Sequence, residues 1–258
     1  MMAVSGGQEP LPDDGRVWAY MDVPSDQNVT ISNSTAAACG WTNVEIDGVD
    51  MGTSWNNVPL TAGTHLLKYT LADSTKLGSL FRTRNYYTKI LLPPTITTIG
   101  NSAFLNTYNN PVLKMDKSKI TTIEYRAFYG EGPKFGNIDF PNLSTLGGEV
   151  WNGYMNPGGA VVKNLGSVTS LPSNVFNQAR ILKYDIPATV TEVATRAFFN
   201  GYVGTSMEIT MRPTTPPTYG SSAIYRVKKI FVPAGSVQAY KTASGWSSWA
   251  NVIEAIPE

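Results

Sequence analysis

The sequence I-T-T-I-G-N-S-A-F at residues 96–104 returns four more times along the chain, and this repeat decides the fold. The later copies read I-T-T-I-E-Y-R-A-F (120–128), L-S-T-L-G-G-E-V-W (143–151), V-T-S-L-P-S-N-V-F (168–176) and V-T-E-V-A-T-R-A-F (190–198). Successive copies begin 22 to 25 residues apart, a period typical of solenoid proteins. Because each coil of a solenoid contacts only its neighbours, we expect function to lie on repeated surfaces rather than in one enclosed cavity.

Each position of the nine-residue phrase predicts a structural role. Positions one and four are always aliphatic, and position eight is small or β-branched. Position nine is always a large aromatic residue: Phe104, Phe128, Trp151, Phe176 and Phe198. We therefore expect each coil to add one ring to a continuous aromatic stack in the core.

A short run of alternating character precedes the phrases and predicts a strand for each coil. The runs cover residues 88–93, 111–116, 137–141, 182–187, 207–213 and 228–233. A period of two points two residues of each run inward: Ile90 and Leu92, Leu113 and Met115, Ile138 and Phe140, Tyr184 and Ile186, Ile209 and Met211, and Ile230 and Val232. It leaves Lys89, Lys114, Asp139, Lys183, Asp185, Glu208 and Lys229 outward. The run 160–165 belongs to the series in either of two registers, and the strands together predict one parallel sheet.

This pattern of strand, L-P-x-x-I-x-x-I and A-F resembles the BspA-like leucine-rich repeats of bacterial surface proteins. The resemblance covers about residues 71–258, including a shortened first phrase at 74–81. Residues 228–258 look like the C-terminal cap of that family, with a last strand, a short helix and a segment that bears Trp246 and Trp249. The resemblance implies a mostly β protein whose solenoid has one parallel sheet. It also implies a source among bacterial surface proteins or phages of gut bacteria, which share repeats of this kind.

Residues 1–70 have a different pattern. Four short alternating runs are separated by turn signals, and Asp47-Gly48 predicts a two-residue hairpin. We therefore expect a small antiparallel, Ig-like β-sandwich that covers the first coil of the repeats.

Composition limits the classes of partner. Only 15% of the 258 residues are charged and the net charge is +1, which provides little attraction to phosphate backbones and argues against a nucleic-acid partner. No apolar run has the length of a membrane span. The single cysteine, Cys39, excludes an internal disulfide and is expected in the core.

The residues give little support to catalysis, so we expect no enzyme, no cofactor and no metal site. His65 is the only histidine and is expected to be exposed on a strand. Asp13-Asp14 and the pair Asp47 and Asp50 do not follow a calcium-loop spacing, and they are expected to be solvated turn residues. The sparse acids form no recognisable pair of facing carboxylates, as a glycosidase requires.

Tyrosines in the connections between strands are the predicted binding residues. Many lie beside glycine or asparagine, which is typical of adaptable recognition loops, and a protein or a glycan would both suit them. The candidates are Tyr86, Tyr87, Tyr108, Tyr129, Tyr154, Tyr202 and Tyr219.

The first fifteen residues lack the basic and apolar regions of a signal peptide. They are too polar to fold alone, so we expect residues 1–15 to act as an anchor on a partner or on a second copy, which leaves a homo-oligomer as an alternative. The function expected from the whole sequence is recognition or attachment on a virion surface or on a bacterial cell surface.

Overall fold

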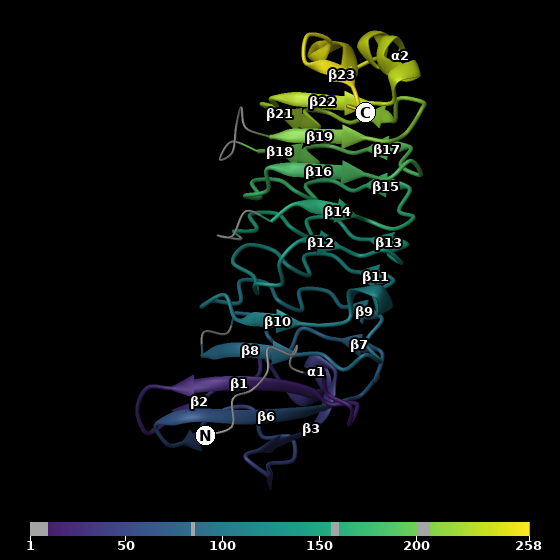
Figure 1. The fold of residues 1–258 in the computed structure, drawn as a ribbon. Coiled ribbons are helices and arrows are strands. Elements are labelled where there is room, and N and C mark those ends of the chain that lie inside the picture. The colour runs from purple at the N-terminus through teal and green to yellow at the C-terminus, as the bar shows by residue number, and fades with distance from the viewer. Residues whose placement is uncertain (1–9, 84–85, 156–159, 201–206, 258) are drawn as a thin grey trace, which may run out of the picture.

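The computed structural model describes residues 10–83, 86–155, 160–200 and 207–257, and its strands are stacked into one elongated column (Figure 1). The N-terminal residues form an antiparallel sheet at the lower end of the column. Its strands are β1 (Val17–Val23), β6 (Gly63–Leu71), β3 (Trp41–Ile46) and β4 (Val49–Asp50), in this spatial order. A further sheet contains β2 (Gln27–Val29) and β5 (Val58–Leu60), and helix α1 (Ala36–Cys39) precedes β3.

The predicted antiparallel sheet is therefore present, but the second layer of the expected sandwich is reduced to the pair β2 and β5. The first coil of the solenoid supplies the missing cover. Phe81 packs edge-to-face against Tyr69 at 6.1 Å between ring centroids, and Tyr69 packs in the same way against Trp41 at 5.5 Å. The hydroxyl groups of Tyr69 and Tyr87 lie within hydrogen-bonding distance of each other and of the Ile31 carbonyl. One core thus runs from the N-terminal sheet into the repeats.

The sheet itself also continues into the solenoid. Strand β8 (Tyr87–Leu91) pairs antiparallel with β1, with Trp18 opposite Leu91, and it pairs parallel with β10 (Val112–Lys114). The predicted units 1–70 and 71–258 consequently share a sheet as well as a core.

Parallel strands continue up the front of the column in Figure 1. They are β12 (Ile138–Asp139), β14 (Val162–Asn164), β16 (Lys183–Ile186), β19 (Glu208–Met211), β22 (Lys229–Val232) and β23 (Ile253–Ala255). The expected sheet is divided between β10 and β12, where a single bridge joins Val112 to Lys134. At this break Lys117, in the 3-10 helix η1 (Lys117–Lys119), donates from Nζ to the carbonyl oxygens of Phe135 at 2.7 Å and Asn137 at 2.6 Å. A side chain thus satisfies backbone groups where the ladder is interrupted.

Short strands within the phrases form further rows along the column. One row contains β7 (Lys76–Leu77), β9 (Thr98–Ile99), β11 (Thr122–Ile123) and β13 (Thr145–Leu146). It is followed by β15 (Ser170–Leu171), β17 (Glu192–Val193) and β20 (Thr218–Tyr219). In the last two coils β18 (Phe198–Phe199) pairs with β21 (Ile224–Tyr225).

The predicted alternation of the long strands is confirmed at every inward position except Met115, which is only half-buried, directly after β10. The ambiguous run 160–165 takes the register that buries Val162 and exposes Lys163.

The predicted aromatic stack is also confirmed, and Phe81 extends it by one ring. Neighbouring rings are tilted by 14° or less, and every ring in the stack is fully buried. The centroid distances are 5.7 Å for Phe81 and Phe104, 5.4 Å for Phe104 and Phe128, 6.1 Å for Phe128 and Trp151, 5.2 Å for Trp151 and Phe176, and 5.7 Å for Phe176 and Phe198.

Helices and the last strand close the upper end of the column. The segment contains η3 (Ala234–Ser236), α2 (Val237–Thr242), η4 (Trp246–Trp249) and β23. The buried Trp246 donates from Nε1 to the Pro217 carbonyl at 2.7 Å, and the Tyr240 hydroxyl donates to the Pro213 carbonyl at 3.0 Å. These bonds attach the closing segment to the last coil, where position nine is Ile224 instead of an aromatic residue.

Candidate functional site

A continuous backbone ladder fixes the turn that follows each two-residue strand. The N–H groups at positions seven, nine and the second residue after the phrase donate to the next coil, as Arg126, Phe128 and Gly130 do to the carbonyls of Gly148, Val150 and Asn152. Position seven has a left-handed backbone in the six coils whose phrases lie between residues 96 and 224, with φ between 52° and 57°, although no glycine occurs there. Its side chains are Ser102, Arg126, Glu149, Asn174, Arg196 and Ser222. The ladder holds a conformation that costs an L-residue about 1–2 kcal/mol.

The residue directly after each phrase forms a second row beside position seven. This row is Leu105, Tyr129, Asn152, Asn177, Phe199 and Tyr225. We call these two rows, together with the adjoining residues Tyr125 and Arg226, the turn face; β18 and β21 mark it in Figure 1.

The lower part of the turn face contains an aromatic and charged cluster. Arg126 lies over the rings of Tyr125 and Tyr129, at 4.8 Å and 5.2 Å from the centroids. Its Nε donates to Glu149 Oε2 at 2.8 Å, and the Tyr125 hydroxyl donates to Glu149 Oε1 at 3.1 Å. Desolvation and the bond to Glu149 raise the pKa of Tyr125, and the same carboxylate raises the pKa of Arg126. The cluster is therefore charge-balanced and held in one geometry.

The upper part of the turn face contains a second aromatic cluster without an acid. Phe199 and Tyr225 stack with centroids 4.7 Å apart and planes 18° apart. The Arg196 guanidinium lies 5.3 Å from the Phe199 centroid, and the Arg226 guanidinium lies 5.2 Å from that of Tyr225. Within the described residues, neither arginine forms an ion pair with a carboxylate. The two rings thus position two exposed cationic groups.

The predicted tyrosines divide into three groups. Tyr87 and Tyr154 are buried, so their prediction as ligand-contacting residues is wrong: they lie in the core, where the Tyr154 hydroxyl donates to the Pro133 carbonyl at 2.9 Å. Tyr86 packs against the core and Tyr219 is half-buried beneath Trp246 and Trp249. Tyr108 is exposed and Tyr129 belongs to the turn face, whereas Tyr202 lies outside the described residues.

The sequence interpretation missed Tyr125, Arg126, Arg196, Tyr225 and Arg226 as surface candidates. Extending the internal comparison by one residue beyond each phrase would have identified the column that holds Tyr129, Phe199 and Tyr225.

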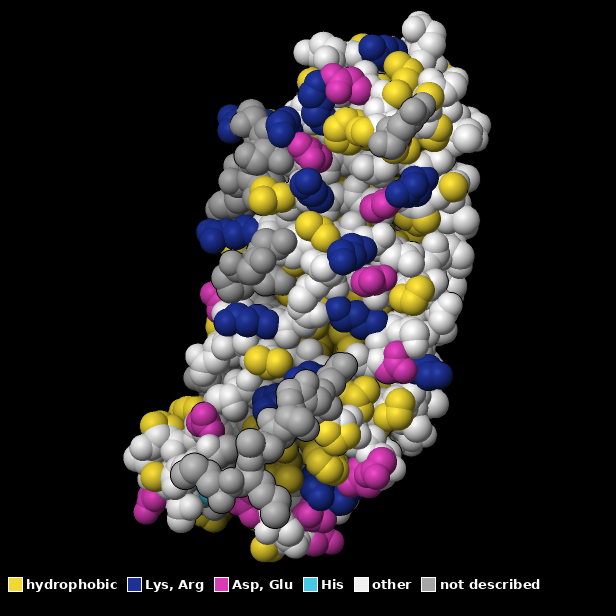
Figure 2. All heavy atoms as spheres, in the orientation of Figure 1, with side chains coloured by type: hydrophobic (Ala, Val, Ile, Leu, Met, Phe, Trp, Pro, Cys, Tyr) yellow, Lys and Arg dark blue, Asp and Glu magenta, His cyan; other side chains and the backbone are white. Residues whose placement is uncertain are grey.

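The face of the long strands carries charges of both signs, which alternate along the column in Figure 2. Lys183 and Lys228 both pair with Glu208, at 3.6 Å and 2.8 Å. Arg212 pairs with Asp185 at 2.5 Å, and Lys229 pairs with Glu254. Exposed pairs of this kind contribute little stability and suit a solvated surface.

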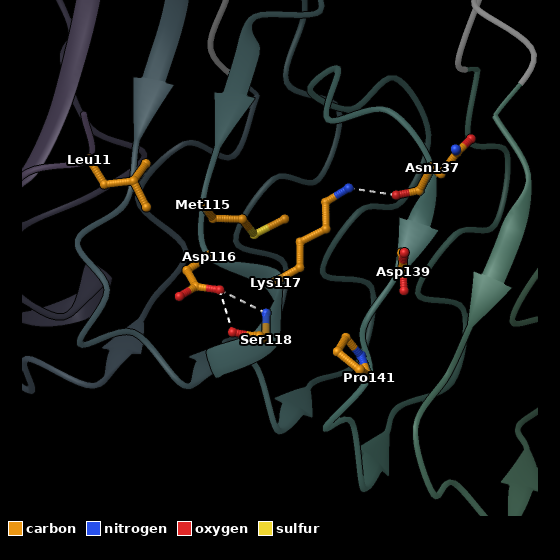
Figure 3. A pocket seen from close by; sticks show the side chains of 8 residues that line it. All are labelled: Leu11, Met115, Asp116, Lys117, Ser118, Asn137, Asp139 and Pro141. Atoms are coloured by element: carbon orange, nitrogen blue, oxygen red, sulfur yellow. Dashed lines mark hydrogen bonds between the residues drawn. The ribbon is translucent and has the colours of Figure 1, made fainter. Parts of the chain in front are cut away.

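An open recess of about 590 Å³ lies on the same side, at the break between β10 and β12 (Figure 3). Leu11, Met115, Lys117, Asn137 and Asp139 are among the residues that line it. Burial lowers the pKa of Lys117, but its ammonium group is already occupied by the carbonyls of Phe135 and Asn137. The lysine therefore supports the coil and is not available as a base.

The expectation that His65 is exposed is wrong. The ring is buried, its Nδ1 lies 2.6 Å from Asp47 Oδ2 and its Nε2 lies 3.0 Å from the Thr61 carbonyl. Burial lowers the pKa of His65, but the bonds to Thr61 and Asp47 outweigh this effect and raise it overall. His65 and Asp47 thus stabilise the hairpin that Asp47-Gly48 was predicted to form, and β3 and β4 confirm that hairpin.

Acidic residues proposed as turn groups have local partners. Asp50 accepts from the Gly52 N–H at 2.8 Å, and Asp14 accepts from Arg16 Nε at 2.9 Å and from Trp18 Nε1 at 3.0 Å. In the described part of the chain, no three His, Cys, Asp or Glu side chains gather as a metal site.

The predicted anchor, residues 1–15, lies largely outside the described residues, so contact with a partner stays a prediction. In its described part Leu11 borders the recess of Figure 3 and Pro12 is buried on the same chain. None of the helices in the described segments has the length and apolar character needed to cross a bilayer.

A comparison of the sequence with protein families identifies the repeats. The model of the BspA type leucine rich repeat region matches residues 78–203 in six copies. These residues are BspA-type leucine-rich repeats. The BspA-type coils include those that carry the aromatic stack and most of the turn face. Repeats of this family generally serve as non-enzymatic binding modules in surface-associated proteins. No match was found among the curated proteins.

Proposed function

We propose that this protein is a non-enzymatic recognition module, displayed on a bacterial cell or on a virion, that attaches to a protein or a glycan. The turn face carries this proposal. Six coils present side chains of different chemistry at fixed intervals, on a backbone that the ladder holds rigid. Such an array suits an extended partner that contacts several coils at once.

A role in binding, and not in hydrolysis, is supported by the chemistry of this face. Glu149 is the only acid in its two rows, and Arg126 and Tyr125 already bond both of its oxygens. A glycosidase needs a second carboxyl group facing the first across the substrate. The turn face supplies no such group.

Attachment is tested by incubating the fluorescently labelled protein with a panel of bacterial cells and measuring bound fluorescence against concentration. We expect saturable binding to some cells, and loss of that binding after protease or periodate treatment tells whether a protein or a glycan is recognised. Immunogold microscopy of producing cells and of virions locates the displayed protein. Absence of saturable binding across the panel, or release of cleaved glycan, would contradict the proposal.

A further inference from the structure

The turn face changes in chemistry along the column. Its two central coils carry amide groups, Asn152, Asn174 and Asn177, and the Asn177 amide donates to Asn152 Oδ1 at 3.2 Å across the coils. Above them Arg196 lies over the Phe199 ring and Arg226 lies over the Tyr225 ring, and the two rings are stacked on each other. Hydroxyl-bonding groups and unpaired cations therefore lie in one continuous array.

The placement of Arg196 and Arg226 over aromatic rings suits them to bind an anion. A guanidinium group bonds a carboxylate through two parallel N–H groups, and stacking on an aromatic ring reduces the freedom lost when it binds. Arg126 shows the consequence of a nearby acid, because Glu149 occupies it within the protein. Arg196 and Arg226 have no such acid among the described residues, so an anionic ligand would supply the missing partner.

The spacing of the coils selects among extended anionic ligands. Neighbouring coils linked by a backbone ladder repeat every 4.7–4.9 Å or so. An extended peptide rises about 3.3 Å per residue, so its side chains on one face recur at roughly 6.6 Å and fall out of step with the coils. One pyranose unit of an extended glycan advances by nearly the height of one coil. Amides can then bond ring hydroxyls at successive coils, while the arginines bond carboxylates.

We propose that the turn face binds an extended acidic glycan along the column, with Arg196 and Arg226 bonding its carboxylates and the amides of Asn152 and Asn174 bonding its hydroxyls. This inference rests on the proposed recognition function and assigns it a surface and a class of ligand. The aromatic rings of Phe199 and Tyr225 position the arginines.

The test measures binding of tetragalacturonic acid by isothermal titration calorimetry at low salt. The comparison ligands are neutral cellotetraose and the acidic peptide tetraglutamate. The double variant Arg196→Gln with Arg226→Gln removes both cations, and Arg212→Gln on the long-strand face is the matched control for charge and substitution. Thermal unfolding of each variant checks that the fold is intact.

We expect tetragalacturonic acid to bind and the double variant to weaken it by about ten-fold or more, since two charge-assisted contacts are lost. Arg212→Gln should leave the affinity within about two-fold, because solvent and salt screen a charge on another face. Cellotetraose should bind more weakly than the acid. Added salt should reduce the affinity for tetragalacturonic acid.

Several results would overturn the inference: no binding of tetragalacturonic acid, equal binding of tetraglutamate, or an unchanged affinity in the double variant. Equal binding of tetraglutamate would indicate an acidic peptide as partner. Cell attachment separates this inference from the broader proposal. If the double variant still binds cells like the parent while tetragalacturonic acid does not bind, the recognition function stands and the turn-face assignment falls.

Discussion

Replacing Phe128 by Ala removes the ring at the centre of the aromatic stack. This ring is fully buried between Phe104 at 5.4 Å and Trp151 at 6.1 Å, and Phe135 lies against it at 4.9 Å. The coils above and below are joined to it by the backbone ladder, so the surrounding structure has little freedom to close the cavity. The variant therefore tests the stack directly.

The expected loss of unfolding free energy follows from these contacts. A buried Phe→Ala change costs about 3–5 kcal/mol, and the cost rises with the volume of the cavity that remains. Aromatic pairs contribute about 0.5–1.5 kcal/mol each beyond the burial of area. With three ring neighbours and a rigid backbone, Phe128→Ala should lie near the upper end of that range, at about 4–5 kcal/mol. This is a large share of the stability of an ordinary domain, which is about 5–15 kcal/mol.

Urea unfolding followed by circular dichroism and by tryptophan fluorescence measures the loss. Trp151, one of six tryptophans, stacks on the replaced ring, so the two probes together show whether the fold is lost in a single transition. The control is Leu182→Ala, at a side chain that is 38% exposed, where a change within about 0.5 kcal/mol is expected. A loss below about 1 kcal/mol for Phe128→Ala would refute the account of the stack.

Two further predictions concern the hairpin and one tight turn. Raising the pH from about 6 to 8.5 should lower the urea midpoint of the parent but not that of His65→Gln. The folded-state pKa of His65 is raised, so stabilisation by its charged ring is complete below about pH 6.5 and is lost as the pH rises through the folded value; equal pH slopes would contradict this. Gly166→Ala should cost about 2–4 kcal/mol, because it combines a left-handed backbone (φ +60°) with a methyl group 2.3 Å from the Leu143 carbonyl oxygen. Gly52→Ala has nearly the same φ (+58°) and open space around it, so a cost of about 1 kcal/mol is expected there, and equal costs in urea unfolding would disprove the close contact.

Much of the fold could be predicted because the repeats of this chain can be compared with one another. Five copies of one phrase identify the buried positions, and the structure confirms the ring stack and all of the inward strand residues except Met115. The left-handed backbone at position seven could not be predicted in the same way. Arg126, Glu149 and Arg196 occupy it without glycine, since hydrogen bonds between coils, and not local preference, hold the turn.

The break in the sheet was hidden for a related reason. The phrases on either side of residues 130–137 begin at the usual spacing, so the sequence gives no sign of an interruption. In the structure, however, Lys134 forms only a single bridge with Val112. Lys117 looks like an ordinary outward lysine in the sequence. Its bonds to two backbone carbonyls depend on the path of the next coil, which no local pattern records.

The candidate site was the least predictable part, and the solenoid explains why. The positions that keep the same residue type in every coil are those whose side chains pack in the core, because each coil must pack against the next. Binding residues occupy the positions that packing leaves free, where neighbouring coils differ: Tyr129, Asn152, Asn177 and Phe199 follow one another at a single position. A search for a repeated binding motif therefore selects tyrosines such as Tyr154, whose ring serves the core. In this chain, binding residues are therefore indicated by positions whose side chains differ from coil to coil while the backbone conformation stays the same. The turn face is such a surface, because aromatic, amide and arginine side chains occupy equivalent positions in successive coils.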